Sequence, residues 1–353
     1  MKKMIMLGAT CAMLAACSGG KTEFAAEPVA DPIAWSDEVT TNDNLKGDLY
    51  VDVNGYNAAG QLALVEQYNI KDGARTLATT TIYQNGRPAY AKDVEGDKVT
   101  GTDVWTYNPE GFITEEVISA YVGEKQKLEP KTKYTYTYDE QGDLTNIIEA
   151  EYKNLRYTDV YEWTYSYADG RLDQRKDYTF DGGQKKQSCW YTYKYNAAGQ
   201  VEQEDYYFYD IKQGKLKHDA KTLYEYNAAG QTVKATVIRH KNNQKRDDIN
   251  SRLFTYEYNE AGQPTYEGQQ KWASAQNQWD VAVRSTQYAY DEAGRLAQKT
   301  SMVNTTKGLK ITTETVAYGE GSQTPAAAAA PAASTKPVVN LADKHLTSAA
   351  EED

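Results

Sequence analysis

The segment Tyr288-Ala-Tyr290-Asp291-Glu-Ala-Gly294 decides the fold, because its pattern returns along the chain at a regular interval. Alternating tyrosines place two rings on one face of a β-strand. An Asp or Asn then opens a tight turn, and glycine takes positive φ without steric cost. Each copy of the pattern therefore predicts a β-hairpin with a type I turn followed by a left-handed glycine.

Eight further copies precede this one, so the chain is a repeat protein. The glycines of successive copies lie 25 to 32 residues apart. Self-similarity at such a period indicates stacked supersecondary units. The nine turn glycines are Gly60, Gly86, Gly111, Gly142, Gly170, Gly199, Gly230, Gly262 and Gly294.

The length of each turn predicts which residues face one another across the hairpin. In seven copies the tyrosine four residues before the glycine should face the residue two after it. The copies ending at Gly86 and Gly170 have one residue fewer, and their Asn-Gly and Asp-Gly suit type I′ loops that keep the tyrosine opposite the same partner position. The expected pairs are Tyr56–Leu62, Tyr83–Pro88, Tyr107–Ile113, Tyr138–Leu144, Tyr167–Leu172, Tyr195–Val201, Tyr226–Thr232, Tyr258–Pro264 and Tyr290–Leu296.

Tyrosine is the dominant aromatic residue, with 30 Tyr against 5 Phe among 353 residues. Most of its expected partners are aliphatic, which favours core packing on the tyrosine face. We therefore expect an all-β domain over residues 46–319, an antiparallel meander of Tyr-rich hairpins. So many strands should form an elongated, curled or spiralling sheet. A propeller or a sandwich is the alternative.

The copy Tyr288-Ala-Tyr290-Asp291-Glu-Ala-Gly294-Arg295-Leu296 resembles the YD-repeat (Rhs-repeat) family. The resemblance covers roughly residues 50–320. It implies a spiralling sheet of β-hairpins, which in some members encloses toxins or mediates cell contact. The repeats here are longer than is usual for the family, and the sequence after the last repeat does not look like a toxin. A delivery function is therefore not carried over.

A second pattern lies at the start of the chain. Two lysines follow Met1, and an apolar run then extends to Ala16. A short basic start and an apolar core of this length predict a secretory signal peptide over residues 1–16. The segment Leu14-Ala15-Ala16-Cys17 resembles the lipobox of bacterial lipoproteins, which implies cleavage before Cys17 and acylation of that cysteine.

The predicted acyl chains make the membrane a partner of the protein. In such lipoproteins an Asp after the cysteine often retains the protein in the inner membrane, so Ser18 favours the outer membrane. Residues 17–45 are then a lipidated tether. Residues 320–353 form an Ala/Pro-rich low-complexity tail without a core-forming pattern.

The net charge and the cysteine content exclude one class of partner and one kind of cross-link. The net charge of −11 argues against nucleic acid as a partner. Cys11 is removed with the signal peptide and Cys17 is lipidated, which leaves Cys189. No intramolecular disulfide is therefore expected, and Cys189 is predicted as a small buried residue on the tyrosine face.

Residues suited to catalysis are scarce in the sequence. His218, His240 and His345 stand in loop-like or tail contexts, without a second histidine at ligand spacing. The glycine motifs are explained as hairpin turns rather than as phosphate loops. We expect no catalytic residue, no metal and no cofactor.

Aromatic residues on the polar face are the exception to the tyrosine pattern. In the hairpin that turns at Gly199, the expected register pairs Lys194 with Glu202 and places Trp190 opposite Tyr206. Phe208 follows on the same face. An exposed aromatic cluster is a candidate binding patch, here Trp190, Tyr206 and Phe208.

Together these patterns predict a non-catalytic, membrane-anchored envelope lipoprotein. Its repeat domain would act as a binding or structural surface for a protein or a glycan. Two alternatives remain open, a glycan-active hydrolase and an inert structural spacer. A clustered pair of buried acidic residues would favour the hydrolase.

Overall fold

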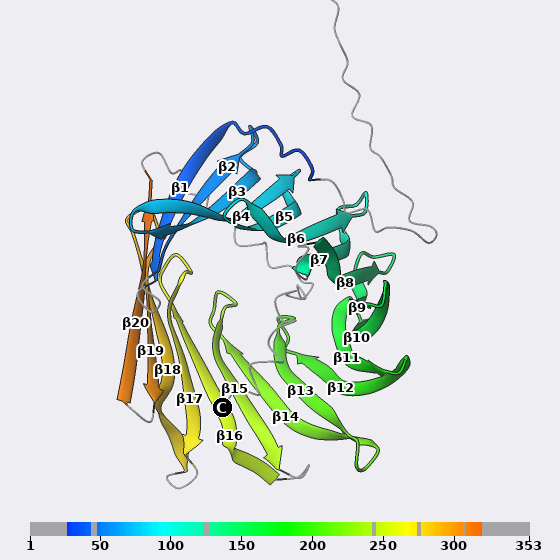
Figure 1. The fold of residues 1–353 in the computed structure, drawn as a ribbon. Coiled ribbons are helices and arrows are strands. Elements are labelled where there is room, and N and C mark those ends of the chain that lie inside the picture. Colours follow the sequence, from blue (N-terminus) through cyan, green and yellow to red (C-terminus); the bar gives the residue numbers. More distant parts are fainter. Residues whose placement is uncertain are drawn as a thin grey trace, which may run out of the picture.

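The computed structural model describes residues 27–43, 48–122, 127–241, 245–273, 277–305 and 308–319. The predicted signal peptide, Cys17 and the tail 320–353 lie outside these ranges. Within them, twenty β-strands follow one another around a ring (Figure 1). The strands are β1 (Trp35–Asp43), β2 (Asp48–Tyr56), β3 (Leu62–Lys71), β4 (Ala74–Gln84), β5 (Arg87–Glu95), β6 (Lys98–Tyr107), β7 (Ile113–Val122), β8 (Lys127–Tyr138), β9 (Leu144–Lys153), β10 (Arg156–Ala168), β11 (Arg171–Asp181), β12 (Gln184–Tyr195), β13 (Val201–Asp210), β14 (Lys215–Tyr226), β15 (Thr232–Lys241), β16 (Lys245–Tyr258), β17 (Pro264–Ala273), β18 (Gln278–Tyr290), β19 (Leu296–Thr305) and β20 (Gly308–Tyr318).

The strands form an antiparallel meander that closes into a barrel. Each strand pairs with the next, and β1 also pairs with β20 from Val39↔Tyr318 to Asp43↔Glu314. The expected all-β meander is confirmed, but in place of the expected elongated, curled or spiralling sheet the strands close into a barrel. Neither alternative, the propeller nor the sandwich, describes the closed sheet. Closure removes two sheet edges whose backbone groups would otherwise lack partners.

The strand that closes the barrel lies inside the range 17–45 that we expected to be a tether. β1 carries no copy of the repeat, but Trp35 stacks on Tyr56 with ring centroids 3.9 Å apart. The segment before β1 also contacts the sheet, because Asp31 accepts a hydrogen bond of 2.8 Å from the Asn85 backbone. The folded domain therefore begins before residue 46.

The turns have the predicted geometry. At Gly199, the Asn196 carboxamide oxygen accepts hydrogen bonds from the Ala198 and Gln200 backbone nitrogens, both at 3.0 Å. Gly199 itself has φ of 82°. In one of the two short loops, Asn85 and Gly86 both have positive φ, as a type I′ turn requires.

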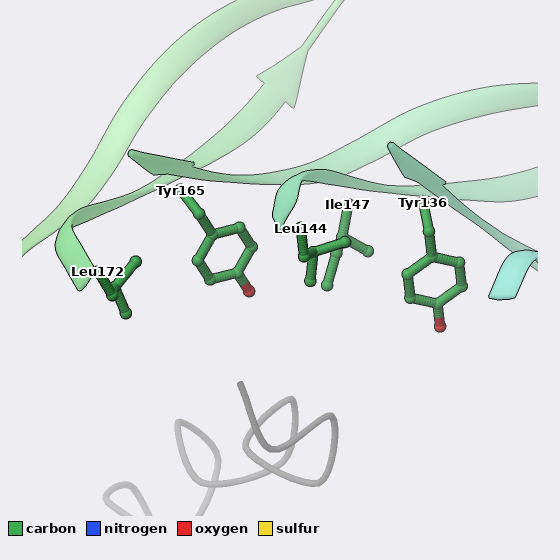
Figure 2. Packing of buried hydrophobic residues seen from close by; sticks show 5 residues of the cluster. All are labelled: Tyr136, Leu144, Ile147, Tyr165 and Leu172. Atoms are coloured by element: carbon green, nitrogen blue, oxygen red, sulfur yellow. The ribbon is translucent and has the colours of Figure 1, made fainter. Parts of the chain in front are cut away.

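All nine expected tyrosine pairs are confirmed, and Leu144 and Leu172 of these pairs belong to the buried core. Figure 2 shows the side chains of its buried cluster pointing to one side of the sheet. We call this the inner face and the opposite side the outer face. The cluster consists of Tyr136, Leu144, Ile147, Tyr165 and Leu172.

The tyrosine hydroxyls add a second repeated interaction, which at seven places links a hairpin to the one before it. The Tyr226 hydroxyl donates to the Val201 carbonyl oxygen at 2.6 Å. Val201 is the strand partner of Tyr195, beside the preceding turn. The hydroxyl therefore bonds to a carbonyl oxygen at the turn end of that hairpin. The donors of this ladder are Tyr107, Tyr167, Tyr195, Tyr226, Tyr258, Tyr290 and Tyr318.

Tyr226→Phe should lower the free energy of unfolding by about 1 kcal/mol, because it removes one hydrogen bond and leaves a carbonyl oxygen unpaired. Tyr161→Phe is the control, since the Tyr161 side chain is 46% exposed and outside the ladder. Urea unfolding curves of the two variants measure the difference. Equal midpoints would show that the hydroxyl ladder does not stabilise the barrel.

The register on the other face differs from the expected one by a single residue. Tyr195 pairs with Val201, but the next pair is Lys194↔Gln203, so Glu202 is an extra residue in its strand. The expected Lys194–Glu202 pair is therefore wrong. The left-handed turn glycine is followed by a β-bulge, and every pair beyond it shifts by one.

Candidate binding surface

The shifted register creates a row of touching aromatic rings across four neighbouring strands. Trp190 on β12 stacks on Tyr207 on β13, with ring centroids 4.9 Å apart. Tyr207 contacts His218 on β14 at 4.9 Å, and His218 contacts His240 on β15 at 4.5 Å. We call these four residues the aromatic row. Since Tyr193 packs against the inner cluster and side chains alternate, Trp190 and its partners lie on the outer face.

The structure divides the expected patch of Trp190, Tyr206 and Phe208 between the two faces. Tyr206 pairs with Tyr191 and Phe208 pairs with Cys189, so both lie on the inner face. The Tyr206 hydroxyl lies 3.3 Å from the Cys189 sulfur. The expected Trp190–Tyr206 pair is wrong, because the bulge after Gly199 moves Tyr207 opposite Trp190. Of the three residues, Trp190 remains on the outer face.

Two histidines belong to strands and not to loops, contrary to the sequence-based expectation. His218 lies within β14 and His240 within β15. His345 lies outside the described residues. The contact between Trp190 and Tyr207 could have been predicted from the sequence. A one-residue bulge after Gly199 places Tyr207 opposite Trp190. The contact with the histidines required the register of two further strand pairs.

The edges of the row are polar. Trp190 Nε1 donates to Gln174 Oε1 at 3.1 Å, and His218 Nε2 lies 2.9 Å from Asp205 Oδ1. Burial lowers the pKa of His240, and the nearby His218 and Lys221 lower it further. His240 is therefore neutral at pH 7 and offers an uncharged ring. The row combines apolar ring faces with donors and acceptors at its margin, an arrangement suited to stacking on a ligand.

Three buried carboxylates of the described residues lie beside a partner. Asp177 forms an ion pair with Arg175 at 2.8 Å, and Asp205 lies beside the aromatic row. Glu162 lies 2.7 Å from Lys185 Nζ. Asp177 and Glu162 are therefore each paired with a basic side chain. In the part of the chain that the structure describes, no group of three or more His, Cys, Asp or Glu is placed to hold a metal ion.

No protein-family model and no curated protein matches the chain. Solved structures with partial similarity include TcdB2-TccC3, at 12% identity and a TM-score of 0.32, over 73% of this chain and 16% of that one. A porin-like protein from Bacteroides uniformis ATCC 8492 has 13% identity and a TM-score of 0.32, over 82% of this chain and 99% of that one. A protein with unknown function from Bacteroides fragilis NCTC 9343 has 13% identity and a TM-score of 0.22, over 45% of this chain and 92% of that one. These values do not place the chain in a family.

Within the described ranges, no helix has the length and apolar character needed to cross a membrane.

Proposed function

We propose that the protein is a non-catalytic envelope lipoprotein, anchored through Cys17, whose barrel of YD-like hairpins binds a protein or a glycan on its outer face. The observation that supports this most directly is the aromatic row. Four rings contact one another in sequence at 4.5 to 4.9 Å, so they form one continuous surface. Ring surfaces of this kind bind the apolar face of a sugar or an apolar side chain of a partner protein.

Two further features favour binding over the two alternative functions. The buried acidic residues Glu162 and Asp177 are engaged by Lys185 and Arg175, which leaves the hydrolase without an observation in its favour. An inert spacer would not need a row of four rings on the face directed away from its core. The row therefore favours a ligand.

Trp190→Ala/Tyr207→Ala should abolish ligand capture while the fold is kept, because it removes half of the aromatic row but none of the inner cluster. Binding is measured on a glycan array and by pull-down from native envelope. The control is Tyr152→Ala/Tyr157→Ala, which removes another aromatic contact of similar size, with centroids 5.2 Å apart. Normal binding by the first variant would refute the role of the row. Unfolding of that variant would show the row to be part of the core.

Changing Cys17 to Ala should release the protein from the outer-membrane fraction, because acyl chains are the anchor in this proposal. The measurement is fractionation of cells followed by immunoblotting, with Ser18→Ala as the control. Sedimentation of the Cys17 variant with membranes would contradict lipid anchoring.

A further inference from the structure

A hollow of about 290 Å³ lies across β16, β17, β18 and β19, away from the aromatic row. Its centre is a cross-strand row on the outer face. Glu257 pairs with Tyr266, and Tyr266 pairs with Gln287. Thr300 continues the row on β19 as the partner of Gln287. The volume is close to the lower end of the ~300–1,000 Å³ typical of small-molecule sites.

Gly268 explains how Tyr266 is oriented in this hollow. Residues 266 and 268 share one face of β17, since side chains alternate along a strand. A Cβ atom on Gly268 would lie 2.5 Å from the Tyr266 hydroxyl oxygen and 2.9 Å from its Cζ atom. The phenol end of Tyr266 therefore covers the glycine, with the backbone beneath the ring. Gly268 does not have positive φ. The lack of room for a side chain, and not the backbone conformation, therefore explains why a glycine stands at this position.

Small residues stand beside and within the hollow. Gly268 pairs with Ser285 next to it, and both are buried. Ala289, which lines the hollow, pairs with Gln298. We call the larger side chains that line the hollow its walls.

The chemistry of the walls fits a polyhydroxylated ligand. The side-chain amides of Gln287 and Gln298 can each donate and accept hydrogen bonds, as sugar hydroxyls can. The hydroxyl of Thr300 has the same double capacity, and the Glu257 carboxylate accepts. The ring of Tyr266 supplies a platform for the C–H face of a pyranose.

Charge selects among such ligands. The chain carries a net charge of −11, and Glu257 adds a local negative charge to the hollow. Both disfavour an anionic sugar. We propose that this hollow is a binding site for a neutral saccharide, with Tyr266 as the stacking residue. The inference rests on the proposed binding function but uses a separate set of residues.

The test is titration of the wild-type protein with neutral hexasaccharides of glucose, mannose, xylose and N-acetylglucosamine, followed by calorimetry and saturation-transfer NMR. At least one of them should bind. Tyr266→Ala should weaken that binding at least about tenfold, which corresponds to about 1.4 kcal/mol. A galacturonic acid hexasaccharide should bind more weakly than the neutral ones.

Gly268→Ala is the sharper variant, because it removes no lining side chain and changes only the position of Tyr266. Its new methyl group would meet only the far end of the Tyr266 side chain, which can swing away. We expect the same loss of affinity with an unchanged melting temperature. If Tyr266→Ala fails to fold, Gln287→Ala/Gln298→Ala provides the second measurement, with an equivalent loss expected.

The variant Trp190→Ala/Tyr207→Ala separates this inference from the proposed function. Retained saccharide binding in that variant, together with loss in Tyr266→Ala, supports the hollow. The opposite result places the saccharide on the aromatic row and overturns the inference, while it supports the proposed function. Absence of binding by every neutral hexasaccharide at millimolar concentration also overturns the inference, and the envelope pull-down still tests the aromatic row.

Discussion

Asp177→Ala should destabilise the barrel by about 3–5 kcal/mol, because it leaves a buried arginine without its counter-charge. Asp177 is 7% exposed, and its carboxylate accepts hydrogen bonds of 2.8 and 2.9 Å from Arg175. The Arg175 guanidinium also lies over the ring of Tyr191, at 4.8 Å from its centroid. The Arg175 side chain is 14% exposed, so in the variant its charge stays largely buried. Guanidinium chloride unfolding measures the change.

Two controls identify the cause of this loss. Asp181→Ala breaks an ion pair of similar length, 2.7 Å to Lys186, but its side chain is 77% exposed, so we expect a much smaller loss of stability. Arg175→Met/Asp177→Leu removes both charges and should restore most of the stability. A double variant as unstable as Asp177→Ala would mean that the position requires a polar pair for its packing.

Unfolding in alkali should be steep above pH 10. Burial raises the pKa of Tyr157 and of Tyr288 to about 12. In the unfolded chain these hydroxyls ionise near their ordinary value of 10.0, so the unfolded state gains charge first. The pKa is raised further, again mainly by burial, for Tyr134, Tyr136, Tyr167, Tyr191, Tyr193 and Tyr206.

The sign of this effect follows from proton linkage. Below pH 10 these tyrosines are protonated in both states, and their contribution to the free energy of unfolding is constant. As the pH rises from 10 towards the raised folded values, the unfolded state binds fewer protons than the folded state, and the free energy of unfolding falls. Each tyrosine that remains protonated only when folded contributes a slope of about 1.4 kcal/mol per pH unit.

The measurement combines thermal melts at a series of alkaline pH values with the absorbance of tyrosinate. We expect tyrosinate to appear together with loss of the β-sheet signal in circular dichroism. The chain unfolded in guanidinium chloride provides the reference titration. Ionisation of all the tyrosines near pH 10 with an intact sheet would contradict the burial of these hydroxyls. Tyr193→Phe should reduce the pH slope by the contribution of one tyrosine.

The hairpins could be predicted because their determinants lie close together in the sequence. The Asn or Asp side chain, the left-handed glycine and the tyrosine occupy one short segment, so the turn type and the nearest pair follow from local chemistry. This is why all nine tyrosine pairs were correct, including Tyr167–Leu172 and Tyr83–Pro88 in the shorter loops. For the same reason, the prediction that Cys189 lies on the tyrosine face was correct.

The candidate site was only partly predictable, because it depends on pairing beyond the turn. Trp190 was correctly placed on the polar face, but its partner shifted from Tyr206 to Tyr207 at the bulge. A one-residue slip moves a whole strand of side chains to the other face. The hollow at Tyr266 could not be predicted from the sequence. Gly268 resembles any other glycine in a strand, and only the structure shows the ring that covers it.

By itself, then, the sequence determined the all-β class, the hairpin repeat and the inner tyrosine core, since each arises from contacts between residues near in the chain. Only the tertiary structure decided that the sheet closes. Closure depends on β1 meeting β20, a contact between Val39 and Tyr318 that no repeat motif encodes. The twist and the bulges of all the strands between them must accumulate to one full turn. That sum is a property of the whole sheet, and it also sets which rings meet on the outer face.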